Sequence, residues 1–138
     1  MSSPVKITPQ LETICQLGVR MAQDQGIDSL LLLLDGPTDW ARLRTLANHE
    51  RLLIAADREE DVVGAKEAGL PTVVLHMSDT PVYEKLTQAL LECVADELLE
   101  PGASVVVLYS GFEVGTIDSI SLVRLDEHLG RLTVRDLR

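Results

Sequence analysis

Apolar residues follow two patterns along this chain, a helical spacing of three to four positions and short continuous runs. The first helical pattern starts behind Thr8 and Pro9, which suit a helix cap and a first helical position, and stops at Gly26. Three further helices are predicted from the same spacing: about ten residues after the loop at 35–38, residues 59–68 with an acidic first turn, and about 18 residues with Thr80 as the cap and Pro81 in the first turn.

Continuous apolar runs lie between these helices and are typical of strands covered on both faces of a sheet. We predict strands at residues 29–34, 52–56, 72–75, 104–109 and 116–123. Intervening helices allow the first four strands to pair in parallel, whereas about six residues before the last strand leave no room for a crossover. The pattern predicts a three-layer α/β sandwich with a mostly parallel sheet in the order 3-2-1-4-5, its fifth strand antiparallel at an edge.

The 138 residues fit one α/β domain at 1–124 followed by a tail at 125–138. Twelve basic and 22 acidic residues give a net charge of -10, which repels phosphate backbones and anionic lipid, so we expect no nucleic-acid or membrane partner. No apolar stretch approaches the roughly 20 residues that cross a bilayer, and the start lacks a signal-peptide pattern. We expect a soluble, cytoplasmic protein in which Cys15 and Cys93 are buried free thiols.

Polar residues follow the predicted first and fourth strands, at the end of the sheet where open α/β folds bind ligands. The order 3-2-1-4-5 reverses between these two strands and creates a crevice there. The candidate crevice residues are Asp35, Gly36, Thr38, Ser110 and Gly111. In an alternative interpretation Thr38, Asp57 and Thr80 are helix caps with a structural role.

The residue types at these strand ends disfavour several kinds of site. No glycine-rich phosphate fingerprint is present, and aspartates at 35, 39, 57 and 79 crowd negative charge around any bound nucleotide. His49, His76 and His128 have no metal-ligand spacing. Ser110 lacks the Gly-x-Ser-x-Gly context of a nucleophile. We therefore predict no catalytic residue, no metal site and no cofactor.

A carboxylate at a strand end also suggests a receiver-like phosphoacceptor domain, with Asp35 or Asp57 as the acceptor. Receivers resemble this chain in size and in the alternation of strand and helix. Their pattern requires an acidic pair after an early strand and a lysine after the last strand, whereas the lysines here are Lys6, Lys66 and Lys85. The receiver remains an alternative based on fold analogy alone.

Two pieces near the C-terminus carry a family resemblance: Ile-Asp-Ser-Ile-Ser at 117–121 and Asp-Glu-His-Leu-Gly-Arg-Leu at 126–132. They are similar to the domain that precedes the cyclase in a family of diadenylate cyclases, a domain that itself resembles the C-terminal α/β domain of pyruvate kinase. Cyclase chemistry in that family depends on Asp-Gly-Ala and Arg-His-Arg motifs. Neither occurs here, since Asp35-Gly36 is followed by Pro37.

The resemblance implies a non-catalytic domain that regulates, assembles or localises a cyclase making cyclic di-AMP from ATP. It also implies a downstream cyclase domain as partner, because residues 133–138 fall about where such a domain would start; we expect an N-terminal domain excised from a longer protein. The alternative from a different functional class is a small-molecule sensor with its ligand in the crevice between the first and fourth strands.

The predicted edge strand at 116–123 offers unpaired backbone groups to another chain. Sheet edges are usually protected by lysine, proline or a bulge, and here Asp118 is the only charged residue. We expect two such edges to pair across a two-fold axis in a homodimer, through Thr116, Asp118, Ser119, Ser121 and Val123. Alternatively the tail, with Leu125, Leu129 and Leu132 at helical spacing, folds back over this edge.

Overall fold

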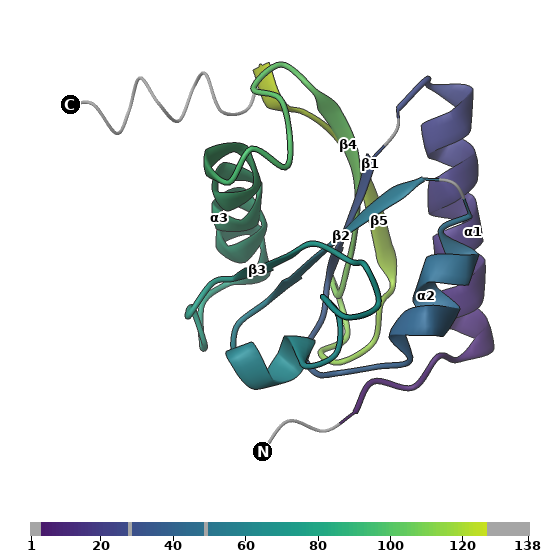
Figure 1. Cartoon of the computed structure of the whole chain (residues 1–138), viewed down its shortest axis with the longest axis vertical. Coiled ribbons are helices and arrows are strands. Elements are labelled where there is room, and N and C mark those ends of the chain that lie inside the picture. The colour runs from purple at the N-terminus through teal and green to yellow at the C-terminus, as the bar shows by residue number, and fades with distance from the viewer. Residues whose placement is uncertain (1–3, 28, 49, 127–138) are drawn as a thin grey trace.

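The computed structural model describes residues 4–27, 29–48 and 50–126, in which a five-stranded sheet lies between layers of helices (Figure 1). The strands are β1 (Ser29–Leu33), β2 (Arg51–Ala56), β3 (Thr72–Val74), β4 (Ser104–Tyr109) and β5 (Ser119–Arg124). Their order is β3-β2-β1-β4-β5, with parallel pairing throughout except between β4 and β5. The predicted α/β sandwich, its strand order and its antiparallel fifth strand are confirmed.

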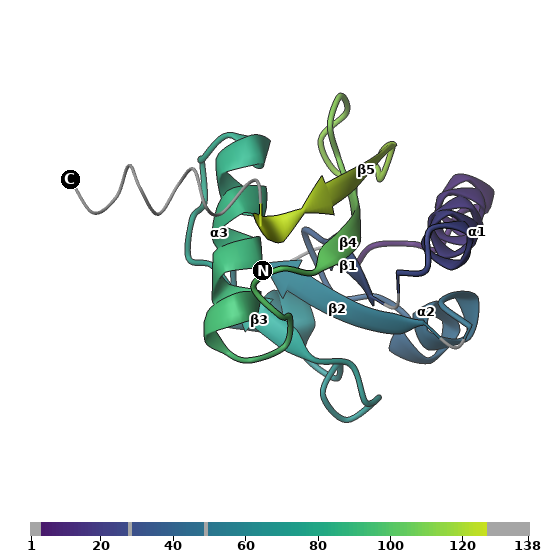
Figure 2. The ribbon, with the colours of Figure 1, turned by 90° about the horizontal axis from the view of Figure 1, so that it is seen from above.

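Helices cover both faces of the sheet. Helices α1 (Pro9–Asp24) and α2 (Trp40–Leu46) lie on one face and α3 (Val82–Ala95) on the other (Figure 2). Leu30 and Leu32 of β1 pack into the core with α1 and α2, whereas Leu31 and Leu33 pack into the core with α3. A continuous leucine run suits β1 because every one of its residues is buried.

Capping side chains set where two of the helices begin. Thr8 caps α1 as predicted, by accepting a backbone N–H of its first turn. Helix α2 is capped by Asp39, so the cap prediction at Thr38 is wrong. Helix α3 begins after Pro81 without a side-chain cap, so the prediction at Thr80 is also wrong. In both cases the chain starts its helix one residue later than the pattern indicated.

The segment 59–68 contains much less helix than predicted. It forms the 3-10 helix η1 (Glu59–Val62) and continues as turns. The indole N–H of Trp40 donates to the carbonyl oxygen of Val63 at 2.7 Å. The next residue, Gly64, has a φ of +91°, which no helix uses. A contact from α2 thus occupies a carbonyl that a longer helix would have needed.

Other differences concern the ends of elements. Helix α3 has 14 residues rather than about 18, because Glu97 adopts a left-handed φ of +61° just beyond it. Strand β5 begins at Ser119 instead of residue 116, because Asp118 is tied to the preceding loop. Leu125 after β5 is fully buried in the core with α3. The predicted helical tail beyond Asp126 lies outside the described residues.

Both cysteines are buried and free, as predicted. Cys15 lies in the core with α1 and Cys93 in the core with α3. Burial raises the pKa of Cys15 to about 11 and the pKa of Cys93 to about 12, so both thiols are neutral at physiological pH and poorly reactive. Within the described residues no helix has the length and apolar character to cross a membrane.

Candidate ligand-binding site

The carboxyl ends of β1, β2 and β4 lie at one end of the sheet, and a polar residue follows each of them. Asp35 comes after β1, Asp57 after β2 and Ser110 after β4. A cavity of about 320 Å³ opens there between the β4–β5 loop and the start of α3, and we call it the crevice. Its walls include Leu33, Asp35, Lys85, Ser110, Gly111 and Phe112.

A shielded ion pair fixes a cation in the wall of the crevice. Lys85, in the first turn of α3, places its Nζ 2.6 Å from Oδ2 of Asp57. The two side chains are only 15% and 14% exposed. Removing either partner would leave the other charge unpaired and shielded from water, which is strongly destabilising. The pair therefore keeps the ammonium group of Lys85 at this position. The prediction of Asp57 as a helix cap is wrong, because the N-cap residue of η1 is Arg58.

Two buried polar atoms at these strand ends, Oδ1 of Asp57 and Oγ of Ser110, have no hydrogen-bond partner among the described residues. Each such atom costs about 1–3 kcal/mol of stability, and native proteins contain few of them. They follow β2 and β4, the two neighbours of β1. This end of the sheet therefore holds buried polar atoms whose hydrogen bonds the described residues do not supply.

The loop between β4 and β5 forms the opposite wall. The carboxylate of Asp118 accepts backbone N–H groups from Gly111 at 2.8 Å, from Glu113 at 2.9 Å and from Phe112 at 3.3 Å. These hydrogen bonds, led by that from Glu113, hold the pKa of Asp118 below its ordinary value. Glycine suits position 111 because a Cβ there would press on the side chains of Ser119 and Tyr109.

The same loop holds two apolar side chains at the mouth of the crevice. Phe112 and Val114 are each 94% exposed and both line the cavity. Large apolar side chains gathered in this way at a cavity indicate contact with a ligand or partner more often than isolated ones do.

Three of the five predicted crevice residues line the cavity: Asp35, Ser110 and Gly111. Gly36 is buried and lies outside the lining. The hydroxyl of Thr38 donates to the carbonyl oxygen of Val5 at 2.6 Å, so Thr38 anchors the N-terminal segment and not a ligand. Sequence reasoning missed Lys85 because its partner is 28 positions away on another element. Its position one turn into a helix after Thr-Pro was the available signal.

The contact between Lys85 and Asp57 also bears on the receiver-like alternative. It supplies a lysine beside an aspartate at a strand end, although Lys85 precedes the last strand. However, Oδ2 of Asp57 is bonded to that lysine and Oδ1 is buried, so neither oxygen is open to a phosphodonor. The geometry favours a ligand beside the pair over a phosphoryl group on it.

A larger cavity of about 520 Å³ lies between η1, β3 and α3, away from the crevice. Its carboxylates are Glu59, Glu60, Glu67, Glu92 and Asp96. Nowhere in the described part of the chain do three or more His, Cys, Asp or Glu side chains gather as a metal-binding group. We describe this cavity as the acidic groove, since it follows the outer edge of β3.

The strand order, the antiparallel fifth strand and the crevice at the strand ends define a pyruvate-kinase-like α/β domain. A pyruvate kinase from Cryptosporidium parvum matches 86% of this chain with a TM-score of 0.64 at 19% identity. The same kinase in complex with ADP matches 86% with a TM-score of 0.66, also at 19% identity. The chain spans 23% and 24% of those enzymes, so the likeness concerns the fold of one part of them.

The family comparison is more specific. A family model described as "Probable sensor domain DacZ_P" matches residues 10–133, and this chain belongs to that family, which is associated with the diadenylate cyclase DacZ. A comparison with curated proteins gave no match. The resemblance to the domain that accompanies a diadenylate cyclase is confirmed, and the family points to a sensor or regulatory role linked to that enzyme.

Proposed function

We propose that this domain is a small-molecule sensor that regulates a diadenylate cyclase, and that its ligand binds in the crevice. The observation that carries the proposal is the fixed ammonium of Lys85 in a cavity that also holds Asp35 and the loop with Phe112. Strand ends of open α/β sheets are the usual ligand position, and the family description favours the sensor over the assembly role.

Synthesis of cyclic di-AMP belongs, in this proposal, to the cyclase and not to this domain. The chain contains neither Asp-Gly-Ala nor Arg-His-Arg. The two buried free thiols of this domain support a reducing, cytoplasmic location for the domain and for the cyclase that it regulates.

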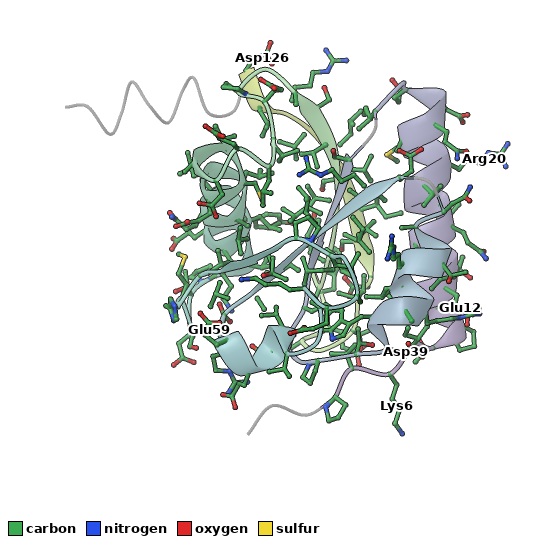
Figure 3. All side chains as sticks on the ribbon, in the orientation of Figure 1. Lys6, Glu12, Arg20, Asp39, Glu59 and Asp126 are labelled. Atoms are coloured by element: carbon green, nitrogen blue, oxygen red, sulfur yellow. The ribbon has the colours of Figure 1, made fainter. Side chains whose placement is uncertain are left out.

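Strand β5 offers a direct route from ligand to enzyme. It starts at the loop that walls the crevice and runs to the opposite end of the sheet, where Asp126 is labelled in Figure 3. A ligand that moves the loop between Gly111 and Asp118 therefore changes the start of β5. We expect that change to alter the segment that follows Asp126.

The test is a thermal-shift screen of metabolites on the purified chain. A ligand at 100 times its dissociation constant adds about 2.7 kcal/mol to the free energy of unfolding. A compound that stabilises the wild type should fail to stabilise Lys85→Gln/Asp57→Asn, which removes both members of the ion pair, and should still stabilise the control Lys66→Gln. The same compound should change cyclic di-AMP synthesis by DacZ joined to this domain. No compound meeting these conditions would contradict the sensor.

We also propose that a second copy of the chain pairs with the outer edge of β5. Within the described sheet β5 pairs with β4 alone. The N–H of Leu125 donates to the carbonyl oxygen of Ala103, and bonded pairs alternate along an antiparallel ladder, so residues 119, 121 and 123 bond to β4. The backbone groups of Ile120, Leu122 and Arg124 therefore face outward.

This register replaces the residues predicted for the dimer edge by Ile120, Leu122 and Arg124. Thr116 and Asp118 precede β5, while Ser119, Ser121 and Val123 direct their backbone groups to β4. Two outward-facing edges related by a two-fold axis would form one continuous sheet and close as a dimer.

A further inference from the structure

The crevice offers groups of both charges to one small molecule. Lys85 and Asp35 both line it, one on the α3 wall and one at the end of β1. Asp57 accepts one of the three N–H groups of the Lys85 ammonium and lies outside the lining of the crevice. The other N–H groups of Lys85 are left as donors on the side of the crevice. The lining residues Thr80, Pro81 and Val82 form the uncapped start of α3, which adds to the attraction for a carboxylate.

The net charge of these groups excludes strongly anionic ligands. Asp57 neutralises Lys85, and the exposed carboxylate of Asp35 then leaves a surplus of one negative charge. A phosphate dianion would meet that carboxylate in a chain whose total charge is already -10. An ammonium group, in contrast, gains a charge-assisted hydrogen bond from Asp35.

Apart from Ser110 and Thr80, the rest of the lining carries no polar side chain, and the space is small. Leu33, Val82, Phe112 and Val114 line about 320 Å³, which holds a compact aliphatic group beside the polar ends. Phe112 and Val114 are the two most exposed large apolar side chains of the described residues, and a ligand with an aliphatic side chain would cover them.

We propose that the crevice binds a small zwitterion of the α-amino acid class with an aliphatic side chain. This inference rests on the proposed sensor function and names its ligand class. The carboxylate is bound by Lys85 and the start of α3, the ammonium by Asp35, and the side chain by Phe112 and Val114.

Calorimetric titration with three probes tests each part of the assignment. L-Leucine carries both charges, 4-methylpentanoate lacks the ammonium, and 3-methylbutylamine lacks the carboxylate. We expect each analogue to bind at least about tenfold more weakly than leucine, which corresponds to about 1.4 kcal/mol. Equal binding of either analogue would overturn the zwitterion.

Matched variants assign each charge to its residue. Asp35→Asn should weaken leucine and the amine about tenfold and should not weaken 4-methylpentanoate, which loses a repelling charge. Lys85→Gln/Asp57→Asn should weaken leucine and 4-methylpentanoate and leave the amine unchanged. The control Asp79→Asn removes an exposed carboxylate outside the lining, at a left-handed φ of +63° that asparagine tolerates, and should bind all probes as the wild type does.

The outcomes separate this inference from the sensor itself. If no probe binds but another metabolite stabilises the wild type and not the ion-pair variant, the zwitterion is wrong and the sensor stands. If neither the binding of the probes nor the stabilisation by any screened metabolite requires the ion pair between Lys85 and Asp57, both proposals fail.

Discussion

The two edges of the sheet differ in length and in the charge around them. Strand β3 has three residues and lies along the acidic groove. Strand β5 has six residues, and its sequence Ser-Ile-Ser-Leu-Val-Arg contains no carboxylate. A short edge flanked by like charges discourages a second copy of an acidic chain, whereas a longer edge without carboxylates permits one. In the proposed dimer, the sheet therefore pairs through β5 and is protected at β3.

The largest effect should follow from a proline on the outward side of β5. Leu122 is 39% exposed, and its N–H faces away from β4 in the observed register. Leu122→Pro removes a donor that the dimer needs and keeps the ladder within the subunit. We expect conversion from dimer to monomer in light scattering after size exclusion at tens of micromolar protein, with thermal stability nearly unchanged.

Two further prolines sharpen this test. Ser121→Pro removes an N–H that bonds to β4, and the acceptor left unpaired on β4 should lower the stability of the monomer itself by about 1–3 kcal/mol. The N–H of Leu75 and the carbonyl oxygen of Pro71 bond to β2, and bonding residues alternate along a strand, so the N–H of Val74 faces outward. Val74→Pro therefore removes a donor from the outer edge of β3. It should leave the dimer intact. A wild-type monomer, or a dimer that survives Leu122→Pro, would contradict pairing through β5.

Strands β1, β2 and β4 were predictable because burial on both faces demands continuous apolar runs. The antiparallel β5 was also predictable, since a short connection from β4 cannot make a crossover. Residues 59–68 were not, because Trp40 ends that helix from 23 positions away in sequence. No local pattern records such a contact.

The candidate site was predictable to the extent that topology alone defines it. Asp35 and Ser110 follow neighbouring strands, and the strand order brings them together. Lys85 was not predictable, because its role depends on where α3 begins relative to the end of β2. Asp118 was assigned to the edge strand, although its carboxylate binds the loop at Gly111.

A moderate effect should follow from neutralising the acidic groove. Glu59→Gln, Glu67→Gln and Glu92→Gln together remove three negative charges beside β3, each worth about 1 kcal/mol against a like charge at close range in water. We expect species larger than a dimer, with self-association rising about tenfold in light scattering. The control Asp24→Asn, Glu100→Gln and Glu113→Gln makes the same change in net charge elsewhere. Equal association of both triple variants would show that net charge, and not the groove, protects β3.

The smallest effect concerns Asp118, the carboxylate that directly precedes β5. Unlike the carboxylates of the acidic groove, it is engaged by the backbone N–H groups of Gly111 and Glu113 and so does not guard the edge. Its pKa is lower in the folded chain than the usual 3.8, so its contribution to loop order is present above about pH 3.8 and is lost as the pH falls further. Amide chemical shifts of Gly111 and Glu113 should therefore titrate with Asp118 below pH 3.8 in the wild type and lose that titration in Asp118→Asn. The matched control Asp126→Asn, beyond the far end of β5, should titrate as the wild type does. If Asp118→Asn instead changed the dimer as strongly as Leu122→Pro, Asp118 would have to act at the edge, and the contrast between a guarded β3 and an unguarded β5 would be wrong.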